Sequence, residues 1–475
     1  MEPAAPLDRV AEIEARSLTF RRELGLATLA LTQIMYVVGS AWVGTAAKLG
    51  PSHVVFWSAA ILLYYLPQAA VVIYLNRLMP LEGGLYQWAT AGLGRFLGFL
   101  TAWNLWAYSI TIMAAFGVII ANNLSYLLTP MGAAFTAESW YTPTVSVAAV
   151  IALTIVSLFG LRTGKWLQSF GGLAQILMFG ALIAVPWVAI GRGPTHAAYH
   201  PLHWAMPTFT LLSVNIFGKL ALGAFSGFEY VAILAGECRA PARTIGQSVL
   251  IATPVIAAMF VFGTSSVLAL VPQSQIDLVS PIPQTLQIGF AGLGVARFLV
   301  PALIVMLLVR QIGNVTLIFA GNARLPMVAG WDHLAPAWFT RLHPRFRTPY
   351  NSILFVGAIT LVLTLLGQAG VGVQEAFQLI ENAAGIFYAF TYLALFAIPL
   401  VGARRLGIAP PLWLRVMSAS GFAVSLLYAV LSVFPIIDVA SWQTFAVKII
   451  SVLALANLVG VGIYVTARRR AAARA

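Results

Sequence analysis

The chain has 475 residues, of which 60% are hydrophobic and only 9% are charged, and its mean hydropathy is +0.90. Soluble domains carry about 25% charged residues, so this composition excludes a water-soluble protein and predicts an integral membrane protein. The net charge of +13 does not indicate nucleic-acid binding, because the basic residues lie in short loops between apolar segments. The single cysteine, Cys238, excludes an intramolecular disulfide.

A membrane-spanning helix needs about 20 mostly apolar residues. The chain holds about twelve such segments, separated by short loops rich in Pro, Gly and polar residues, and we therefore expect an all-α fold. The segments lie near residues 24–47, 53–78, 97–128, 142–161, 167–190, 208–236, 245–271, 297–323, 350–368, 375–400, 412–434 and 442–466.

Basic residues set the expected orientation. With the N-terminus in the cytoplasm, most of the 27 lysine and arginine residues fall on the cytoplasmic side, and only Lys48, Arg192 and Arg297 fall outside. This bias is typical of membrane proteins. It predicts an even number of spans in the cell (inner) membrane, with both termini cytoplasmic. The basic run at 468–470 is expected to bind anionic lipid.

Two apolar segments are interrupted by small residues. The first contains Gly39, Ser40 and Gly44, and the sixth contains Ser226 and Gly227. Glycine-broken segments that open each half of a chain are the best sequence pointer to the binding site of a transporter.

Glu229 follows the second interruption within the same apolar segment. An ionisable residue inside a membrane is costly and is interpreted as functional by default. The alternative is a structural carboxylate that accepts hydrogen bonds from backbone N–H groups freed in the first span.

Other ionisable residues also fall within predicted spans. Arg310 lies midway along the eighth, where it is expected to face a cavity and bind a carboxylate bidentately; the alternative is a structural contact with Glu229 or a carbonyl. Lys219, about 15 Å before Glu229 along a helix, either lines an outer vestibule, or snorkels or pairs with an outer carbonyl. Glu381 and Asn382 form either a cavity edge or an outer pair.

Motifs for an enzyme are absent from the sequence. It contains no phosphate-binding loop, no His-Glu-x-x-His pair and no Gly-x-Ser-x-Gly elbow. The outer-loop residues His196, His200 and His203 have no cysteine or carboxylate nearby to complete a metal site. We therefore expect neither catalytic residues nor a metal or cofactor.

Four motifs, in chain order, resemble those of the amino acid–polyamine–organocation transporter superfamily. Residues 39–41 are similar to its glycine-serine-glycine stretch, and residues 79–88 (MPLEGGLYQW) resemble its Pro-x-x-Gly-Gly-x-Tyr-x-Trp signature. Residues 227–229 (GFE), followed by 236–243 (GECRAPAR), resemble a third motif, and residues 323–324 with 332–336 and 348–349 a fourth. The resemblance covers roughly residues 24–400.

The resemblance implies a LeuT-like fold. Two inverted repeats of five helices would be followed by two peripheral helices, with helices 1 and 6 broken around the substrate. The implied division of the chain is a cytoplasmic segment 1–23, repeats 24–191 and 192–400, peripheral helices 401–467 and a cytoplasmic basic tail 468–475. Half-helix ends suit an amino acid, because the N-terminal end favours a carboxylate and the carbonyl end favours an amine.

The sequence also departs from the family pattern. Ala41 replaces a glycine and is followed by the bulky Trp42, whereas Gly223 stands where some members carry a gating aromatic residue. Gln175 aligns with a lysine that replaces a sodium ion in some members. The coupling ion is therefore open.

From these features we expect a secondary active transporter, a proton-coupled symporter or an exchanger, that moves an amino acid by alternating access. The alternatives are a polyamine or organic-cation transporter of the same fold and a transporter-like ligand sensor. The expected partners are a small-molecule substrate, membrane lipid and protons, but no nucleic acid. Glu229 is the expected coupling residue. The expected substrate-binding residues, of which Tyr108 and Ser109 rest on the resemblance, are Gly39, Ser40, Ala41, Trp42, Gly44, Tyr108, Ser109, Phe225, Ser226, Gly227, Glu229 and Arg310.

Overall fold

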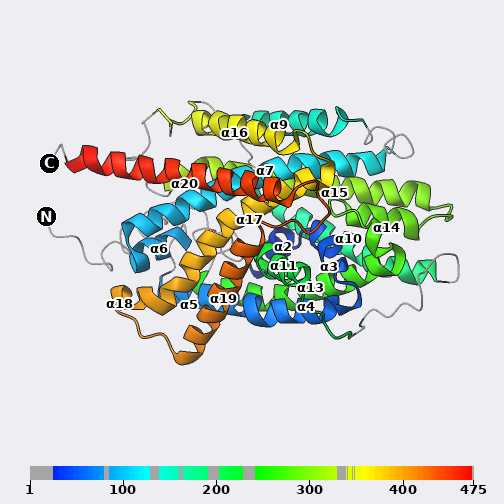
Figure 1. Cartoon of the computed structure of the whole chain (residues 1–475), viewed down its shortest axis with the longest axis horizontal. Helices are drawn as coiled ribbons and strands as arrows, with labels where there is room; N and C mark the ends of the chain where they lie inside the picture. The colour runs from blue at the N-terminus through cyan, green and yellow to red at the C-terminus, as the bar shows by residue number, and fades with distance from the viewer. Residues whose placement is uncertain are drawn as a thin grey trace.

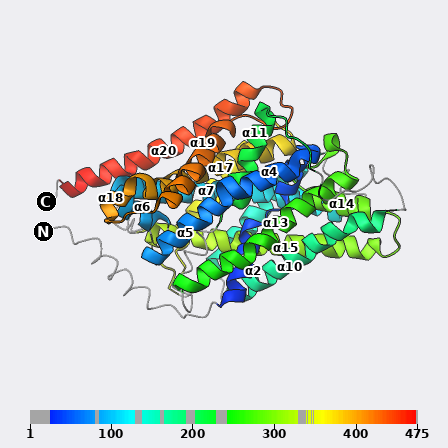
Figure 2. The ribbon, with the colours of Figure 1, turned by 90° about the horizontal axis from the view of Figure 1, so that it is seen from below.

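The computed structural model describes residues 25–79, 85–128, 138–159, 164–190, 202, 204–227, 241–328, 338–339, 341–344, 346 and 348–472. Throughout these ranges the regular structure is helical, with no strand, as expected (Figure 1). The longer helices run roughly alongside one another, as a second view confirms (Figure 2).

The helices fall into long membrane-spanning elements and short connecting turns. In chain order they are α2 (Leu26–Val37), α3 (Ala41–Ala47), η1 (Gly50–Ser52), α4 (His53–Ala60), η2 (Ile61–Tyr65), α5 (Leu66–Leu78), α6 (Leu85–Leu93), α7 (Arg95–Leu127), α9 (Tyr141–Phe159), α10 (Gly164–Ala189), α11 (Leu211–Gly218), η3 (Lys219–Ala224), α13 (Pro241–Leu270), η5 (Gln273–Gln275), α14 (Pro281–Gly289), α15 (Ala296–Val328), α16 (Tyr350–Gln368), α17 (Val373–Ala397), η7 (Ile398–Gly402), α18 (Ala403–Leu406), α19 (Leu412–Leu431) and α20 (Trp442–Ala472).

In the described part of the chain, ten helices are long and apolar enough to cross a membrane. The pair α2 and α3 adds an eleventh span if the two are counted together. The chain is therefore a multi-pass membrane protein. Only a shorter apolar stretch, Leu211–Ala224, represents the predicted span at 208–236, so the count of twelve and the inverted repeat stay predictions.

The first span is broken where the sequence predicts. Helix α2 ends at Val37, Val38 is extended (φ −81°, ψ 94°), and α3 restarts at Ala41 with a bend of 53° between the two axes. Gly39 favours this break, because glycine destabilises a helix by about 1 kcal/mol relative to alanine.

In the sixth predicted span, the described helix ends at Phe225. Gly227 has a φ of +125°, a conformation that side chains disfavour. Replacing Gly227 with alanine is expected to cost about 1–3 kcal/mol of backbone strain and to lower the melting temperature in detergent. The change Gly246→Ala is the matched control, since its new Cβ would meet its nearest neighbour at 3.8 Å. Equal melting temperatures for the two variants would show that alanine at position 227 does not strain the backbone.

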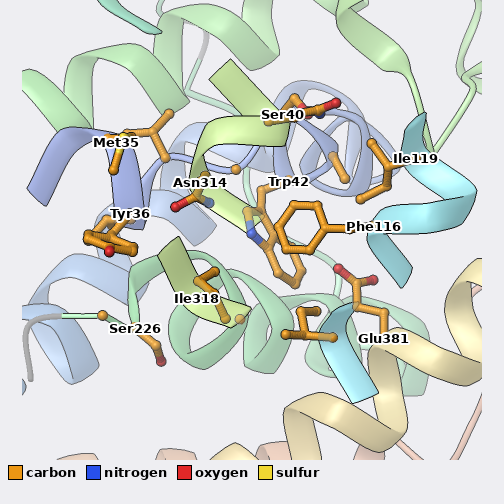
Figure 3. A pocket seen from close by; sticks show the side chains of 18 of the residues that line it. Met35, Tyr36, Ser40, Trp42, Phe116, Ile119, Ser226, Asn314, Ile318 and Glu381 are labelled. Atoms are coloured by element: carbon orange, nitrogen blue, oxygen red, sulfur yellow. The ribbon is translucent and has the colours of Figure 1, made fainter. Parts of the chain in front are cut away.

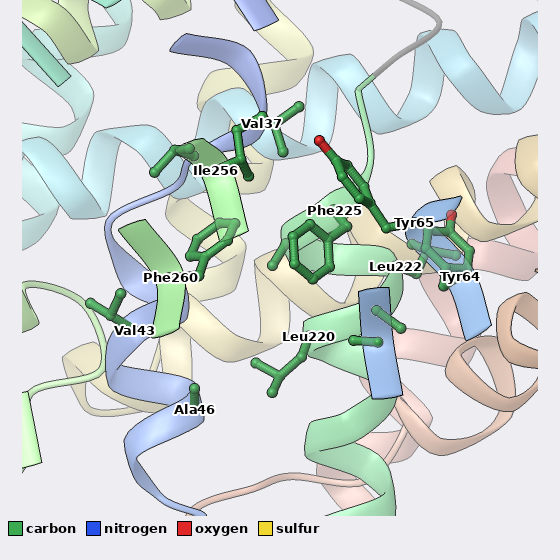
Figure 4. Packing of buried hydrophobic residues seen from close by; sticks show 14 of the residues in the cluster. Val37, Val43, Ala46, Tyr64, Tyr65, Leu220, Leu222, Phe225, Ile256 and Phe260 are labelled. Carbon is green, nitrogen blue, oxygen red and sulfur yellow. The ribbon is translucent and has the colours of Figure 1, made fainter. Parts of the chain in front are cut away.

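Aromatic packing holds the end of η3 in place (Figure 4). Phe225 meets Trp57 edge-on at 5.3 Å between ring centroids and Phe260 edge-on at 5.4 Å. Trp57 and Phe260 stack on each other at 4.6 Å, and Tyr65 lies 4.6 Å from Phe225. Such pairs stabilise beyond the area they bury, so the cluster fixes the point at which this helix ends.

Helices α7 and α17 pack against each other and carry much of the cavity described below. Helix α20 lies at the periphery, with most of its surface exposed (Figure 2). It is attached to α7 by two hydrogen bonds, from Trp103 Nε1 to the Ala456 carbonyl (2.9 Å) and from Asn104 Nδ2 to Asn457 Oδ1 (3.0 Å). Polar side chains commonly join transmembrane helices in this way.

Candidate functional site

A cavity of about 120 Å³ lies at the break in the first span (Figure 3). Its walls come from α2, α3, α7, α15, α17 and the residues around the end of η3. The predicted site residues that line it are Gly39, Ser40, Ala41, Trp42, Tyr108, Ser226, Gly227 and Arg310. Residues from distant parts of the sequence therefore meet where the helix is interrupted.

Three predicted residues lie apart from the cavity lining. Phe225 belongs to the aromatic cluster above. Ser109 is buried and donates a hydrogen bond to the Leu105 carbonyl at 2.9 Å within its own helix. Gly44 allows α3 to approach α14, since a Cβ there would lie 2.9 Å from Pro281 Cβ. Glu229 lies outside the described residues, as do the three outer-loop histidines.

Several cavity residues were absent from the predicted set. Asn314 follows Arg310 by one helical turn and faces the same cavity, and this i, i+4 polar pair is a signal that sequence reading could have used. Tyr388 follows Glu381 by two turns and also lines the cavity. It stacks on Tyr108 at 3.9 Å with an interplanar angle of 3°, a contact that no sequence pattern indicates.

The carbonyl end of α2 is satisfied by side chains from two other helices. Gln175 Nε2 donates to the Val38 carbonyl at 2.9 Å, and Arg310 Nη1 donates to the Met35 carbonyl at 3.3 Å. A broken helix leaves its last carbonyls without intrahelical partners, and such groups must be satisfied inside a membrane. These two donors therefore stabilise the break.

The guanidinium of Arg310 retains donor capacity. It is 4% exposed and lines the cavity, and its Nε has no hydrogen-bond partner among the described residues. A guanidinium carries five N–H donors in a planar fork, so the contact with Met35 leaves most of them available. The geometry thus combines the two alternatives set out above, a contact with a backbone carbonyl and a side chain facing the cavity.

A polar chain connects α7 and α15 to the start of α3. Asn123 Nδ2 donates to Gln311 Oε1 at 2.8 Å, and Gln311 Nε2 lies 3.5 Å from Ser40 Oγ. Asn123 therefore orients Gln311, whose amide reaches the side chain of Ser40 at the interruption.

The end of η3 has its own set of hydrogen bonds. The N–H of Gly227 donates to the Tyr392 hydroxyl at 3.0 Å, and Gln68 Nε2 donates to the same hydroxyl at 2.6 Å. The hydroxyls of Tyr64 and Ser226 lie 3.3 Å apart. The Gly227 N–H at the end of this helix is thus satisfied by Tyr392 on α17, and Gln68 of the second span holds that hydroxyl in place.

The indole of Trp42 fits between two glycines. A Cβ at Gly39 would lie 2.7 Å from Trp42 Cδ1, and a Cβ at Gly223 would lie 2.3 Å from Trp42 Cη2. Figure 3 shows the indole beside Phe116 within the cavity. The large residue on α3 and the missing side chain on η3, both departures from the family pattern, are therefore complementary in space.

The cavity wall carries charges of both signs, Arg310 and Glu381. Among the described residues, no group of three or more His, Cys, Asp or Glu side chains could hold a metal ion. The arrangement is therefore suited to an organic ligand that has both charged and apolar parts.

Known proteins that this chain resembles are transporters. A family model described as "Amino acid permease" matches residues 24–457. An uncharacterized transporter of Mycobacterium tuberculosis is 27% identical, covering 82% of this chain and 81% of its own length. The serine/threonine exchanger SteT of Bacillus subtilis is 22% identical, covering 69% of this chain and 70% of its own. The "Probable agmatine/putrescine antiporter AguD" of Lactococcus lactis is 22% identical, covering 55% of this chain and 54% of its own.

Proposed function

Since this chain belongs to the amino acid permease family, a family of transporters rather than enzymes, we propose that it is a secondary active transporter that moves an amino acid by alternating access. The observation that carries the proposal is the cavity at the break of the first span, where Arg310 offers unused donors close to the carbonyl end of α2. Substrate sites of this kind lie at broken helices near the membrane midplane.

In this proposal the two ends of an α-amino acid are recognised by different groups. The carboxylate binds the guanidinium of Arg310, whose planar fork matches it bidentately. The amine binds near the carbonyl end of α2, where the partial negative charge of a helix terminus favours a cation. Residues 35–38 line the cavity and bring that terminus to it.

Transport would follow from rocking one group of helices against the other around the fixed site. We propose five-helix repeats at 24–191 and 192–400, peripheral helices at 401–467, and cytoplasmic segments at 1–23 and 468–475. We further propose location in the inner membrane with both termini cytoplasmic and lipid contact by the basic tail, which the distribution of basic residues supports.

Coupling is assigned to Glu229, as a proton carrier in symport or as a charge that accompanies exchange. Support comes from its place in an apolar segment immediately after Gly227. The change Glu229→Gln should abolish proton-driven uptake and preserve substrate exchange, whereas full proton-dependent uptake in this variant would remove the assignment.

A second candidate is transport of a polyamine or another organic cation by the same site. The carboxylate of Glu381 on the cavity wall favours it, as does the similarity to the antiporter of Lactococcus lactis. The two candidates differ in whether binding to the site requires a carboxylate on the substrate.

Reconstituted protein tests the function directly. Proteoliposomes preloaded with an unlabelled compound are supplied with labelled amino acids or putrescine outside, and exchange is measured with and without a proton gradient. Uptake of an amino acid supports the proposal, uptake of putrescine alone supports the second candidate, and a ligand that binds without flux would indicate a sensor. Protein-free liposomes are the control.

A further inference from the structure

A buried lysine is bonded next to a cavity-lining residue but does not itself line the cavity. Lys219 is the first residue of η3 and is only 1% exposed. Its Nζ donates a hydrogen bond to Asn382 Oδ1 on α17. The ammonium group is therefore fixed inside the protein, and it cannot reach lipid headgroups or water by snorkelling.

The neighbouring residue Glu381 does line the cavity. It is 8% exposed and interacts electrostatically with Lys219, and Figure 3 shows its carboxylate directed toward Trp42 and Phe116. The phenol of Tyr428 on α19 also interacts with this carboxylate. Lys219 is held at Asn382, the sequence neighbour of Glu381, and so places a cation near this carboxylate. Arg310 is a second cation on the wall of the same cavity.

We propose that Lys219 is a tethered counter-charge that neutralises Glu381 and so makes the cavity select substrates with an uncharged side chain. This inference rests on the proposed function and names the substrate class of the same site. When Arg310 binds the substrate carboxylate, the pair of Glu381 and Lys219 contributes no net charge. A cationic side chain on the substrate then gains little binding energy from Glu381, because the ammonium of Lys219 cancels most of the attraction.

Electrostatics gives the size of the effect. A unit charge about 10 Å away, at an effective dielectric constant near 20, changes the affinity for a charged ligand by roughly tenfold. Because the pair lies in a membrane-embedded site, solvent screening is weak. Removal of either partner should therefore change the ratio of affinities for charged and neutral substrates by about tenfold. Removal of Lys219 should favour cationic substrates, and removal of Glu381 should favour anionic ones.

A purely structural role makes a different prediction. If the bond between Lys219 and Asn382 only ties η3 to α17, then loss of the ammonium lowers stability and affects all substrates equally. The ratio of affinities for differently charged substrates separates the two possibilities, because this ratio is insensitive to a uniform loss of binding or to the fraction of protein that folds.

The experiment measures competition by L-leucine, L-lysine and L-glutamate against a bound neutral amino acid, in wild type, Lys219→Met, Glu381→Gln and the double variant. The wild type should prefer leucine. Lys219→Met should improve the affinity for L-lysine relative to leucine by about tenfold, and Glu381→Gln should do so for L-glutamate. The double variant should return to the wild-type order.

Three results would overturn the inference. These are unchanged affinity ratios in both single variants, a wild type that already prefers L-lysine, and single variants that shift in the same direction. If Lys219→Met does not fold, Glu381→Gln still gives the opposite half of the test. If wild type binds leucine but the ratios do not move, only this inference fails, whereas the absence of both binding and exchange for every amino acid would remove the proposed function as well.

Discussion

The change Arg310→Ala is expected to weaken binding of an α-amino acid by about a hundredfold, the largest effect predicted for the site. A bidentate pair between a guanidinium and a carboxylate consists of charge-assisted hydrogen bonds, each contributing about 1.5–3 kcal/mol. A hundredfold change in Kd corresponds to about 2.7 kcal/mol. The measurement is the Kd of a labelled amino acid for the detergent-purified protein.

Two controls separate ligand binding by Arg310 from its contact with the first span. Arg310 also donates to the Met35 carbonyl, so its loss could disturb α2 without any role in binding. The change Arg310→Lys keeps the charge but removes the fork, and it should recover only part of the affinity. A substrate analogue without the carboxylate should bind wild type and Arg310→Ala equally. If both ligands lose the same affinity in Arg310→Ala, the role of Arg310 is to stabilise α2 and not to bind the substrate.

The change Gly223→Ala is expected to reduce transport by more than about tenfold, because its Cβ would lie 2.3 Å from Trp42 Cη2. That distance is shorter than any tolerated contact, so the indole or η3 must move, and overpacking of this kind costs about 1–3 kcal/mol. The measurement is the initial rate of exchange in proteoliposomes, together with the melting temperature of the purified variant.

A matched pair of variants tests this explanation. Adding Trp42→Phe removes the outer ring of the indole and should restore exchange in the Gly223→Ala background, which a double-mutant cycle would show as a favourable coupling. Gly180→Ala, where the new methyl group meets nothing within 4 Å, should leave exchange unchanged. If Trp42→Phe gives no rescue, the indole is not what the new methyl group meets in the working protein.

The polar residues illustrate how far the sequence could predict the site. Arg310 and Glu381 are conspicuous in apolar segments, and their presence near a cavity follows from the cost of burying charge in a membrane. The contacts that buried polar residues make cannot be inferred in the same way. Gln175 is separated from Val38 by 137 positions, and Lys219 from Asn382 by 163. Sequence patterns report which face of a helix is polar, whereas the partner depends on how whole helices pack.

Phe225 and Tyr388 show the same limit for aromatic residues. Phe225 is adjacent to the interruption in sequence, yet it packs against Trp57 and Phe260 away from the cavity. Tyr388, far along the chain, reaches the cavity by stacking on Tyr108. A position next to a break determines where the backbone lies, but the direction of the side chain depends on the conformation of the break itself.

The sequence by itself determined that this protein is a helical membrane protein and that its first span is interrupted near Gly39 and Ser40. Both properties are local, because the length of an apolar run sets a span and small residues weaken the helix they interrupt. Only the tertiary structure decided which side chains enclose the cavity, which donors satisfy the broken ends, and that Lys219 bonds to Asn382, next to Glu381. Those outcomes depend on the packing of helices distant in sequence, for which one chain read alone carries no local signal.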